Sequence, residues 1–538
     1  MNNKTNPYDL MPYQGHPYPA THPGHMAVIA TLFGLSPAAL DQCRVLEIGC
    51  AGGDNLLPLA TAFPKAQFVG LDYSQVQITA AQENQKELQL DNIEFQCANL
   101  CDVDPAKLGQ FDYIIAHGIY SWLPSEAQPA LLKLCRECLS ENGVTFISYN
   151  TLPGWHMRSM LRDFMLFHAT AFGDSPPDVS QAKALLDFMG ADLQSQNTPF
   201  SQYLRTEIER FTSETDHSYL AHEYLEANNE PLYFGDFVAR ARAVGLDYLG
   251  ESEFFSMLGS GISEEAKSRL SSEIKDIVRL EQYFDFMSNR SFRMTLLVRE
   301  GSAINRQITS ERVYSLWVSA MTNTGFQGGE STKALSSNSN QKYQPVANGA
   351  YLNTTSPVVK AALLILQEAY PANIYFEKLL LAARERLTKA HLDSVTIDQD
   401  RITLANALVT AYSVNVIALR VASTKIVPPK DLHTRTKNLF VNKQIRFQAS
   451  KGQLISNLNH RHIKVDEPMR QILMLLDGTS DQPALLNALY ELVDIGQLVI
   501  RDNKGKTLKI KPTSPELETS LITILDTLAT WAMLEDQV

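Results

Sequence analysis

The sequence lacks any apolar run that could cross a membrane, since a spanning helix needs about 20 consecutive apolar residues. The first seven residues, MNNKTNP, also lack the apolar core of a secretory signal peptide. Basic residues are in deficit as well. Lys and Arg number 47 against 59 Asp and Glu, giving a net charge of −12, which argues against a nucleic-acid partner. We therefore expect a cytoplasmic protein with no membrane span.

Cysteine is scarce, and all six cysteines fall within residues 43–138. A secreted disulfide framework would not be confined in this way. Cys135 and Cys138 form a CxxC pair, but they lie in a helical pattern of leucines without a second ligand cluster nearby. We interpret them as small buried side chains of a helix, with a redox or zinc pair as the alternative, and we expect no metal site.

A glycine-rich stretch at residues 44–55 is the strongest local signal. An apolar run ends in Glu47 and Ile48, a loop with few side chains follows, and an amphipathic segment occupies residues 56–63. A second apolar run, at 68–71, ends in Asp72. Strand, glycine loop, helix, strand and acid, in this order, indicate a nucleotide-type site at the edge of a parallel sheet.

The glycines do not fit a dinucleotide site, because Ala51 and Asp54 stand where that fingerprint requires glycine. We expect Asp54 near the N-cap of the following helix, where its carboxylate would take up the amides that a pyrophosphate needs. The loop suits a cationic adenosine ligand without phosphate, which favours S-adenosylmethionine over the alternative, a dinucleotide of an oxidoreductase. The pattern acid-x-Gly-x-(Gly/Ala)-x-Gly at 47–53 resembles motif I of class I methyltransferases.

Each cofactor residue has an expected task. Glu47 faces the cofactor's amino group, and Asp72 accepts both ribose hydroxyls. Asn99 is placed where an acid often holds the adenine amino group. Glycines without Cβ atoms let the backbone approach the ligand, and ordinary turn chemistry is the alternative for each residue. The full candidate set is Glu47, Gly49, Cys50, Ala51, Gly53, Asn55, Asp72, Tyr73, Asn99, Leu100 and His117.

The methyl acceptor is expected beside residues 117–124, which follow the fourth strand. Aromatic faces there can orient an ammonium group, worth about 0.5–2 kcal/mol each. The proline-rich arm at 7–23 is either a lid that lends side chains to the site or a packing arm. The catalytic candidates are His117, Tyr120, Trp122, Tyr18 and His22, with Tyr13, Tyr149 and Trp155 as further aromatics. Core packing is the alternative for these aromatics. No general base can be assigned.

The alternation of strands and helices continues through residues 93–149 and predicts a parallel sheet covered on both faces. Strand patterns at 246–251 and 293–299 complete the sheet only after a long interval, and residues 325–356 resemble a loop or linker. We expect an α/β fold: a Rossmann-like seven-stranded class I methyltransferase sheet with helical insertions, followed by mainly helical C-terminal domains that include a winged-helix unit.

We expect four regions. They are a cofactor-binding domain at 1–156 plus 220–300, a helical insertion for a lid or dimerisation at 157–219, a winged-helix-like middle domain at 301–425, and an α-rich domain at 426–538. A second helical insertion is expected at 256–290.

Six segments together resemble the bacterial methyltransferases that carry a methyltransferase regulatory domain. They are residues 18–23, 46–53, 117–122, 148–156, 219–226 and 292–297. This family includes the rickettsial protein lysine methyltransferases, which modify an outer-membrane autotransporter. The resemblance implies a class I fold, S-adenosylmethionine as cofactor, a homodimer and a downstream winged helix. Asn99 departs from the family's usual acid, and residues 437–459 keep only part of its C-terminal pattern.

The leading hypothesis is an S-adenosylmethionine-dependent methyltransferase that N-methylates lysine side chains of a protein, with cell-envelope proteins among the candidates. The alternatives are a small-molecule methyltransferase and a binding protein that senses the cofactor without catalysis.

Overall fold

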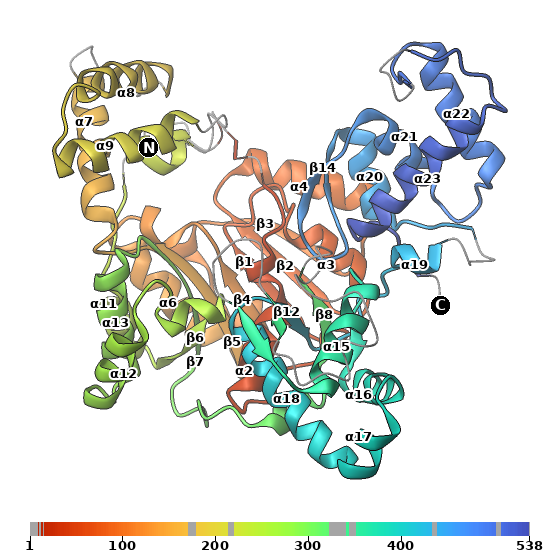
Figure 1. Cartoon of the computed structure of the whole chain (residues 1–538). Helices are drawn as coiled ribbons and strands as arrows, with labels where there is room; N and C mark the ends of the chain where they lie inside the picture. Colours follow the sequence, from red (N-terminus) through yellow and green to blue (C-terminus); the bar gives the residue numbers. More distant parts are fainter. Residues whose placement is uncertain are drawn as a thin grey trace.

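The computed structural model describes residues 9, 12–13, 15–170, 179–213, 220–226, 228–321, 341–343, 351–432, 438–501 and 507–536. Figure 1 shows a central twisted sheet with helices on both faces and a C-terminal group of helices standing to one side.

Seven strands form the central sheet in the order β3-β2-β1-β4-β5-β7-β6. The first five run parallel, and β7 lies antiparallel between β5 and β6. This arrangement confirms the expected class I methyltransferase sheet, including its two late strands. The strands are β1 (Arg44–Ile48), β2 (Gln67–Asp72), β3 (Ile93–Cys97), β4 (Phe111–Ala116), β5 (Leu139–Asn150), β6 (Leu246–Glu251) and β7 (Phe292–Arg299).

Helices cover both faces of the sheet because their apolar positions recur at helical spacing. Ser74 caps α4 by accepting a hydrogen bond from Gln77 N. Cys135 and Cys138 are buried, unbridged side chains of α6, which confirms the packing interpretation of the CxxC pair. The helices are α2 (Pro23–Leu32), α3 (Leu56–Ala62), α4 (Gln75–Glu87), α5 (Pro105–Leu108), α6 (Ala127–Cys138), α11 (Phe234–Ala243), α12 (Glu264–Glu273) and α13 (Ile277–Ser288), with short turns η1 (Pro19–Thr21), η2 (Leu100–Asp102), η3 (Tyr120–Trp122), η5 (Phe254–Leu258) and η6 (Ser310–Val313).

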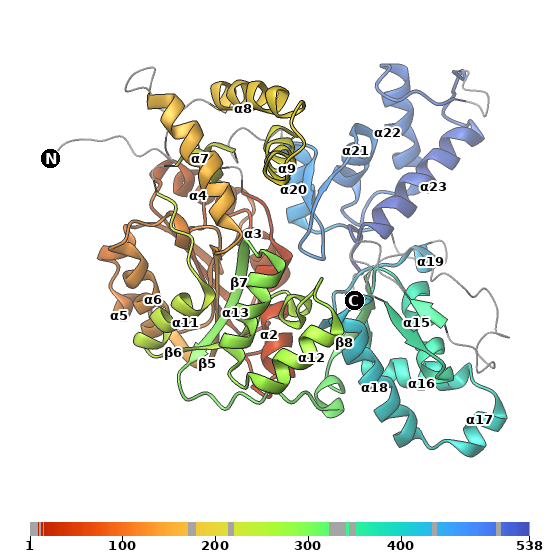
Figure 2. The same ribbon diagram turned by 60° about the vertical axis from the view of Figure 1, so that its left-hand side comes forward.

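The expected insertion after β5 consists of three helices with an apolar cluster of their own. It includes α7 (Trp155–Thr170), α8 (Val179–Leu193) and α9 (Pro199–Ser213), followed by the π-helical turn η4 (Ala221–Leu225). Leu161, Leu186, Leu204 and Phe211 are buried among these helices. Figure 2 shows α7, α8 and α9 together above one end of the sheet domain.

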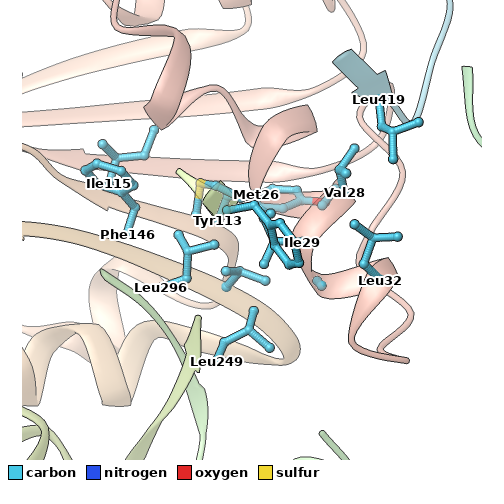
Figure 3. Close-up of a cluster of buried hydrophobic side chains, with 14 of the residues drawn as sticks. Met26, Val28, Ile29, Leu32, Tyr113, Ile115, Phe146, Leu249, Leu296 and Leu419 are labelled. Carbon is cyan, nitrogen blue, oxygen red and sulfur yellow. The ribbon is translucent and has the colours of Figure 1, made fainter. Parts of the chain in front are cut away.

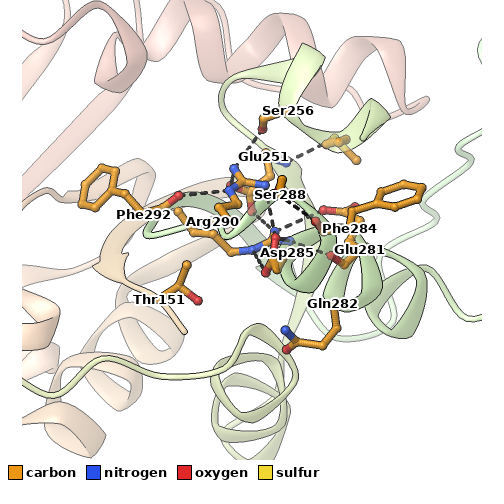
Figure 4. Close-up of polar contacts among 12 residues, drawn as sticks. Thr151, Glu251, Ser256, Glu281, Gln282, Phe284, Asp285, Ser288, Arg290 and Phe292 are labelled. Carbon is orange, nitrogen blue, oxygen red and sulfur yellow. Dashed lines mark hydrogen bonds and ion pairs between the residues drawn. The ribbon is translucent and has the colours of Figure 1, made fainter. Parts of the chain in front are cut away.

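A buried group of charges fastens α13 to the last two strands. The Arg293 guanidinium is fully buried and contacts the carboxylates of Glu251 at 2.8 Å, Asp285 at 2.8 Å and Glu281 at 3.1 Å. Arg290 adds a second cation, 3.0 Å from Glu251 (Figure 4). Burial raises the pKa of Glu281 to about 7, although Arg293 opposes the shift. The second insertion is therefore held to β6 and β7 by charge pairing as well as by apolar packing.

The middle region shares its core with the sheet domain. Helix α2 is buried between the sheet and β12, so that Val28 and Leu32 lie on the side of Leu419 (Figure 3). We keep 301–425 as a proposed domain, although one continuous apolar cluster crosses its boundary. Its three-stranded antiparallel sheet has the order β11-β8-β12. The elements are β8 (Trp317–Ala320), α15 (Pro357–Glu368), β11 (Ile374–Tyr375), α16 (Phe376–Glu385), α17 (Lys389–Ser394), α18 (Ile397–Ser413) and β12 (Ile417–Arg420).

The stretch at 325–356, expected to be a loop, contains two short paired strands. β9 (Gln341–Tyr343) and β10 (Leu352–Thr354) are antiparallel. The reason is burial, since Tyr343 and Leu352 both pack into the core. Residues 322–340 and 344–350 lie outside the described part of the chain.

The C-terminal region has a separate apolar core of its own. A short hairpin, β13 (Leu454–Ser456) and β14 (His462–Lys464), projects from its helices toward the sheet domain. Helix α20 contacts α3 of the sheet domain. The remaining elements are α19 (Pro429–Leu432), α20 (Lys443–Lys451), α21 (Glu467–Leu475), α22 (Gln482–Asp494) and α23 (Pro515–Thr530). Within the described ranges, no helix is long and apolar enough to span a bilayer.

Candidate active site

The glycine loop after β1 is closed by its own backbone. The amides of Gly49 and Cys50 both donate to the Leu71 carbonyl, at 2.7 and 3.0 Å. Gly49 and Gly53 have φ values of +79°, where a side chain is strained. A Cβ atom would also lie 2.5 Å from Ile119 at Gly49 and 2.5 Å from Phe95 at Gly53. Protein packing and a left-handed backbone each require glycine at these positions. The close approach of a ligand to this backbone stays a prediction.

Glu47 ends β1 inside the site and is only 4% exposed. Its Oε1 accepts a 2.8 Å hydrogen bond from Asn55 Nδ2, while the buried Oε2 has no hydrogen-bond partner. Burial raises the pKa of Glu47 to about 8. A buried acceptor without a donor is costly, and an ammonium group would satisfy it. The α-amino group of S-adenosylmethionine fits this requirement.

Asp72 holds the loop to the end of β2. Its two carboxylate oxygens accept the amides of Ala51 at 2.9 Å and Ser74 at 2.8 Å. Burial raises the pKa of Asp72, and these two backbone bonds oppose the shift. Each oxygen keeps a second lone pair, so the carboxylate can still accept ribose hydroxyls. Tyr73, the next residue, is 60% exposed.

The expected role of Asp54 as a helix N-cap is wrong by one residue. Helix α3 begins at Leu56 with Asn55 as its N-cap, and the Asn55 side chain makes no capping bond. Asp54 lies instead in the turn before it, close to Gly15 of the N-terminal arm. Burial raises its pKa to about 6. The carboxylate therefore does not satisfy the helix amides, because the turn carries it away from them.

The Asn55 side chain joins three distant parts of the chain. Its Nδ2 donates to Glu47 and to Thr21 Oγ1, at 2.8 and 3.1 Å. Its Oδ1 accepts from Tyr18 N at 3.1 Å and from His460 Nε2 at 2.8 Å. The residue that holds the cofactor acid is thus itself held by the arm and by the tip of the C-terminal hairpin.

Asn99 follows β3 and caps η2. Its Oδ1 accepts the Cys101 amide at 3.1 Å, and the residue is exposed. This is the turn chemistry that the sequence left open as an alternative. A contact with adenine remains a proposal, as does one for the half-buried Leu100.

His117, at the end of β4, meets the arm. Its Nδ1 lies 2.8 Å from Ser148 Oγ, which also accepts the Gly118 amide at 2.7 Å. The Tyr18 ring packs edge-on against it with centroids 4.0 Å apart. Burial lowers the pKa of His117 to about 4, so the imidazole is uncharged at neutral pH.

Further aromatic side chains extend this contact outward. The hydroxyls of Tyr13 and Tyr18 are 2.9 Å apart. The His16 ring lies 4.2 Å from Tyr18 and 5.3 Å from His462 of β14. The described part of the arm therefore contacts the loop after β1 and the residue after β4. A lid that lends side chains to the methyl acceptor stays a prediction, and residues 7, 8, 10, 11 and 14 are outside the described ranges.

Tyr120 does not face a substrate. Its fully buried ring packs edge-on against Phe237 at 5.2 Å and lies 6.1 Å from Tyr149, which itself stacks on Phe237. The turn η3 directs it inward, beneath α11, so core packing is the correct interpretation. Trp122 is partly buried, with its ring edge-on to the buried Trp155 at 6.4 Å.

His22 is the N-cap residue of α2. Its Nδ1 accepts the Gly24 amide at the start of α2, and its ring packs against Phe63 and His460. The proline at position 23 starts the helix directly after it. A role for His22 at the methyl acceptor stays a prediction.

Sequence reasoning missed His16, Ser148 and His460 as site residues. Ser148 lies in the segment 148–156, which carries the family resemblance but no assigned role. His460 lies in the polar turn 457–462, where a histidine is only a weak signal of a functional site. None of them has a local pattern that links it to residues 47–55.

A sheet of this order, with an acid at the end of β1, a glycine loop and a second acid at the end of β2, defines a class I methyltransferase that depends on S-adenosylmethionine. Family models match residues 45–143 as a methyltransferase domain, 216–299 as a predicted methyltransferase regulatory domain, and 440–533 as the PKMT C-terminal winged helix domain. The chain belongs to the methyltransferase family that combines these three parts. The winged-helix match lies in the region we expected to be α-rich, and not at 301–425.

Two relatives align along nearly the whole chain. An uncharacterized protein of Rickettsia prowazekii, RP789, is 33% identical over 534 residues, which cover 98% of this chain and 94% of the relative. The structure of PKMT2 from Rickettsia typhi superposes with a TM-score of 0.85 at 29% identity and covers 97% of this chain and all of that one. The same PKMT2 in complex with AdoHcy gives a TM-score of 0.84.

Proposed function

We propose that the enzyme transfers methyl groups from S-adenosylmethionine to lysine ε-amino groups of a protein. The observation that carries the proposal is the uncharged aromatic contact between Tyr18 and His117 beside the cofactor loop. The proposal is supported by the likeness to PKMT2 from Rickettsia typhi, a protein lysine methyltransferase that shares the fold over 97% of this chain.

The chemistry of an amine acceptor agrees with these residues. A free lysine has a pKa near 10.4, so the ε-amino group must lose its proton before it can attack a methyl group. Burial keeps His117 uncharged, so it does not repel a cationic side chain. The low pKa also makes His117 a weak base, so we propose that it positions the amine and that the proton leaves to water. The Tyr18 ring supplies an aromatic face for the ammonium group.

Cofactor binding is assigned to the loop as follows. Glu47 receives the amino group through its unpartnered Oε2, and Asp72 receives the ribose hydroxyls. Asn55 positions Glu47. The remaining candidates, Gly49, Cys50, Ala51, Gly53, Tyr73, Asn99 and Leu100, are proposed to line the loop and the adenine side.

We also propose that the insertion at 157–219 mediates a homodimer. Large aromatic side chains are exposed on its helices, among them Phe188 on α8, which is 76% exposed, and Phe200 on α9. Exposed apolar patches of this kind favour a protein contact. Light scattering of the full chain, with Phe188→Ser as the variant, tests the proposal; a wild-type monomer would refute it.

A cytoplasmic location is a further proposal. All six cysteines are free thiols, including the CxxC pair, which is usual in a reducing compartment.

The substrate is tested by incubating the enzyme with methyl-labelled S-adenosylmethionine and a cell-envelope protein fraction, followed by mass spectrometry of the labelled bands. The expected result is mono-, di- or trimethylated lysine. Label on small molecules alone would favour a small-molecule methyltransferase, and cofactor binding without any transfer would favour a sensor. The matched control is Glu47→Ala, which should abolish transfer while leaving the acceptor side intact.

A further inference from the structure

A cavity lies where the sheet domain, the end of β12 and the C-terminal hairpin meet. Its volume is about 570 Å³, within the range of small-molecule sites. It is lined by the start of α2, the residues after α3, the end of β12 and the tip of the β13–β14 hairpin. None of the residues proposed to hold the cofactor lines it.

Arg420, the last residue of β12, is one of four Lys and Arg residues that line this cavity, with Lys65, Lys425 and Arg461. Its Nη2 donates a 2.7 Å hydrogen bond to Asn459 Oδ1. Across the described ranges, no carboxylate forms an ion pair with it. Burial, together with the neighbouring Arg461, lowers the pKa of Arg420 to about 10. Arg420 is half-buried, and a charge withdrawn from water is normally paired, because desolvating it alone is costly.

Three carboxylates line the cavity, those of Asp41, Glu253 and Glu535. Glu535 accepts a hydrogen bond from Asn442 and interacts with Lys425, and Glu253 interacts with Arg290. Asp41 is exposed. None of the three is among the charges that act on Arg420.

Histidines complete the wall around Arg420. His22, His25 and His460 all line the cavity, and burial lowers the pKa of each. Since His22 Nδ1 accepts the Gly24 amide, its Nε2 carries the proton and can donate. Among the residues that the structure describes, no cluster of three or more His, Cys, Asp or Glu side chains could hold a metal ion. The lining thus presents a cation and an N–H donor.

We propose that this cavity is a binding site for a small oxyanion, a phosphate- or carboxylate-bearing molecule, with Arg420 as its counter-ion and His22 as a hydrogen-bond donor. The backbone of the hairpin tip is held in one conformation beside the cavity. His460 has a left-handed φ of +59°, and the Asn457 side chain accepts the amides of Asn459 and Arg461, which fixes the tip against the cavity.

Thermal unfolding of the full-length protein tests the site, with inorganic phosphate and acetate as separate probes and chloride adjusted to hold ionic strength constant. A ligand that binds only the folded state raises Tm in a saturable way. We expect such a shift for at least one probe, in the presence of saturating AdoHcy as well as in its absence. The two arms distinguish a phosphate from a carboxylate ligand.

The variant Arg420→Gln keeps a hydrogen-bonding side chain and removes the charge. It should lose the shift, and its Tm in chloride should be equal to or above that of the wild type, because a half-buried cation without an acidic partner has been removed. His22→Phe keeps the ring, removes the donor and should weaken the response severalfold. Lys430→Gln, on the exposed face of α19, is the matched control and should respond like the wild type.

No saturable shift in the wild type, or an equal shift in Arg420→Gln, would overturn the proposal. Should Arg420→Gln fail to fold, an unaltered response of His22→Phe would overturn it too. No methyl acceptor enters these measurements, so their failure would leave the proposed function untouched.

Discussion

His460 Nε2 donates a 2.8 Å hydrogen bond to Asn55 Oδ1, across 405 residues of chain. Asn55 in turn donates to Glu47, the acid at the centre of the cofactor loop. The winged-helix region therefore takes part in positioning the cofactor site, although it does not provide the carboxylate itself.

His460→Ala should weaken cofactor binding. A net hydrogen bond contributes about 0.5–1.5 kcal/mol, so the Kd for AdoHcy should rise by roughly threefold to tenfold. Isothermal titration calorimetry measures the change. Lys464→Ala, exposed on the same hairpin, is the control. Equal affinities of wild type and His460→Ala would show that Asn55 is held adequately without the hairpin.

Glu47→Gln should stabilise the protein without cofactor and abolish tight cofactor binding. Folding raises the pKa of Glu47 from 4.5 to about 8, so the folded state binds the proton more tightly and this group lowers stability as pH rises from 4.5 to 8. At pH 7 the free energy of unfolding of Glu47→Gln should exceed that of the wild type by at most about 3 kcal/mol.

Denaturant unfolding at pH 7 and at pH 4 measures this effect. The gain should disappear at pH 4, where the carboxyl is protonated in both states. Glu94→Gln, exposed on β3, should change nothing. A stability loss at pH 7 would contradict the assignment.

Cofactor binding should tighten as pH rises through neutrality. Below a pKa of about 8 the Glu47 carboxyl holds a proton that an ammonium ligand must displace. Affinity for AdoHcy should therefore increase up to tenfold per pH unit between about pH 6 and 8 and level off above that. Calorimetry in buffers of different ionisation enthalpy should register the proton released. A pH-independent Kd with no proton release would refute this role for Glu47.

Tyr18→Ala should slow methyl transfer, whereas Tyr18→Phe should retain much of it. The ring against His117 orients the amine, a contact worth about 0.5–2 kcal/mol, or up to roughly thirtyfold in kcat/KM. Cofactor affinity should hold, because the arm reaches Asn55 through the Tyr18 backbone amide. Steady-state kinetics together with calorimetry separate the two effects. Equal activity of both variants would exclude the ring from acceptor binding.

Arg293→Ala should be strongly destabilising. It leaves three buried carboxylates, Glu251, Glu281 and Asp285, without their central cation, and breaking such a group costs about 3–5 kcal/mol. Guanidinium unfolding monitors the loss, with Lys275→Ala at an exposed position as the control. A loss of less than about 1 kcal/mol in the free energy of unfolding would mean that the three carboxylates become protonated at little cost.

Much of the sheet domain was predictable because its signals are local. The apolar runs at 44–48, 67–72 and 111–116 and the glycines between them define strand and loop without knowledge of the fold. The roles of Glu47 and Asp72 follow from their positions at the ends of strands. Tyr120 was misplaced because an aromatic residue after a strand can face either the ligand or the core, and only the packing of α11 over it decides which.

By itself the sequence determined the α/β class, the sheet, the cofactor loop and the long helical insertions, since periodicity and turn residues act over a few positions. Only the tertiary structure decided that Asn55 bonds to His460, that His22 lines the cavity beside Arg420, and that Arg420 has no acidic partner among the described residues. The physical reason is that these contacts depend on how three regions, far apart in the chain, pack against one another. Neither hydrophobic periodicity nor charge pattern along the chain records that packing.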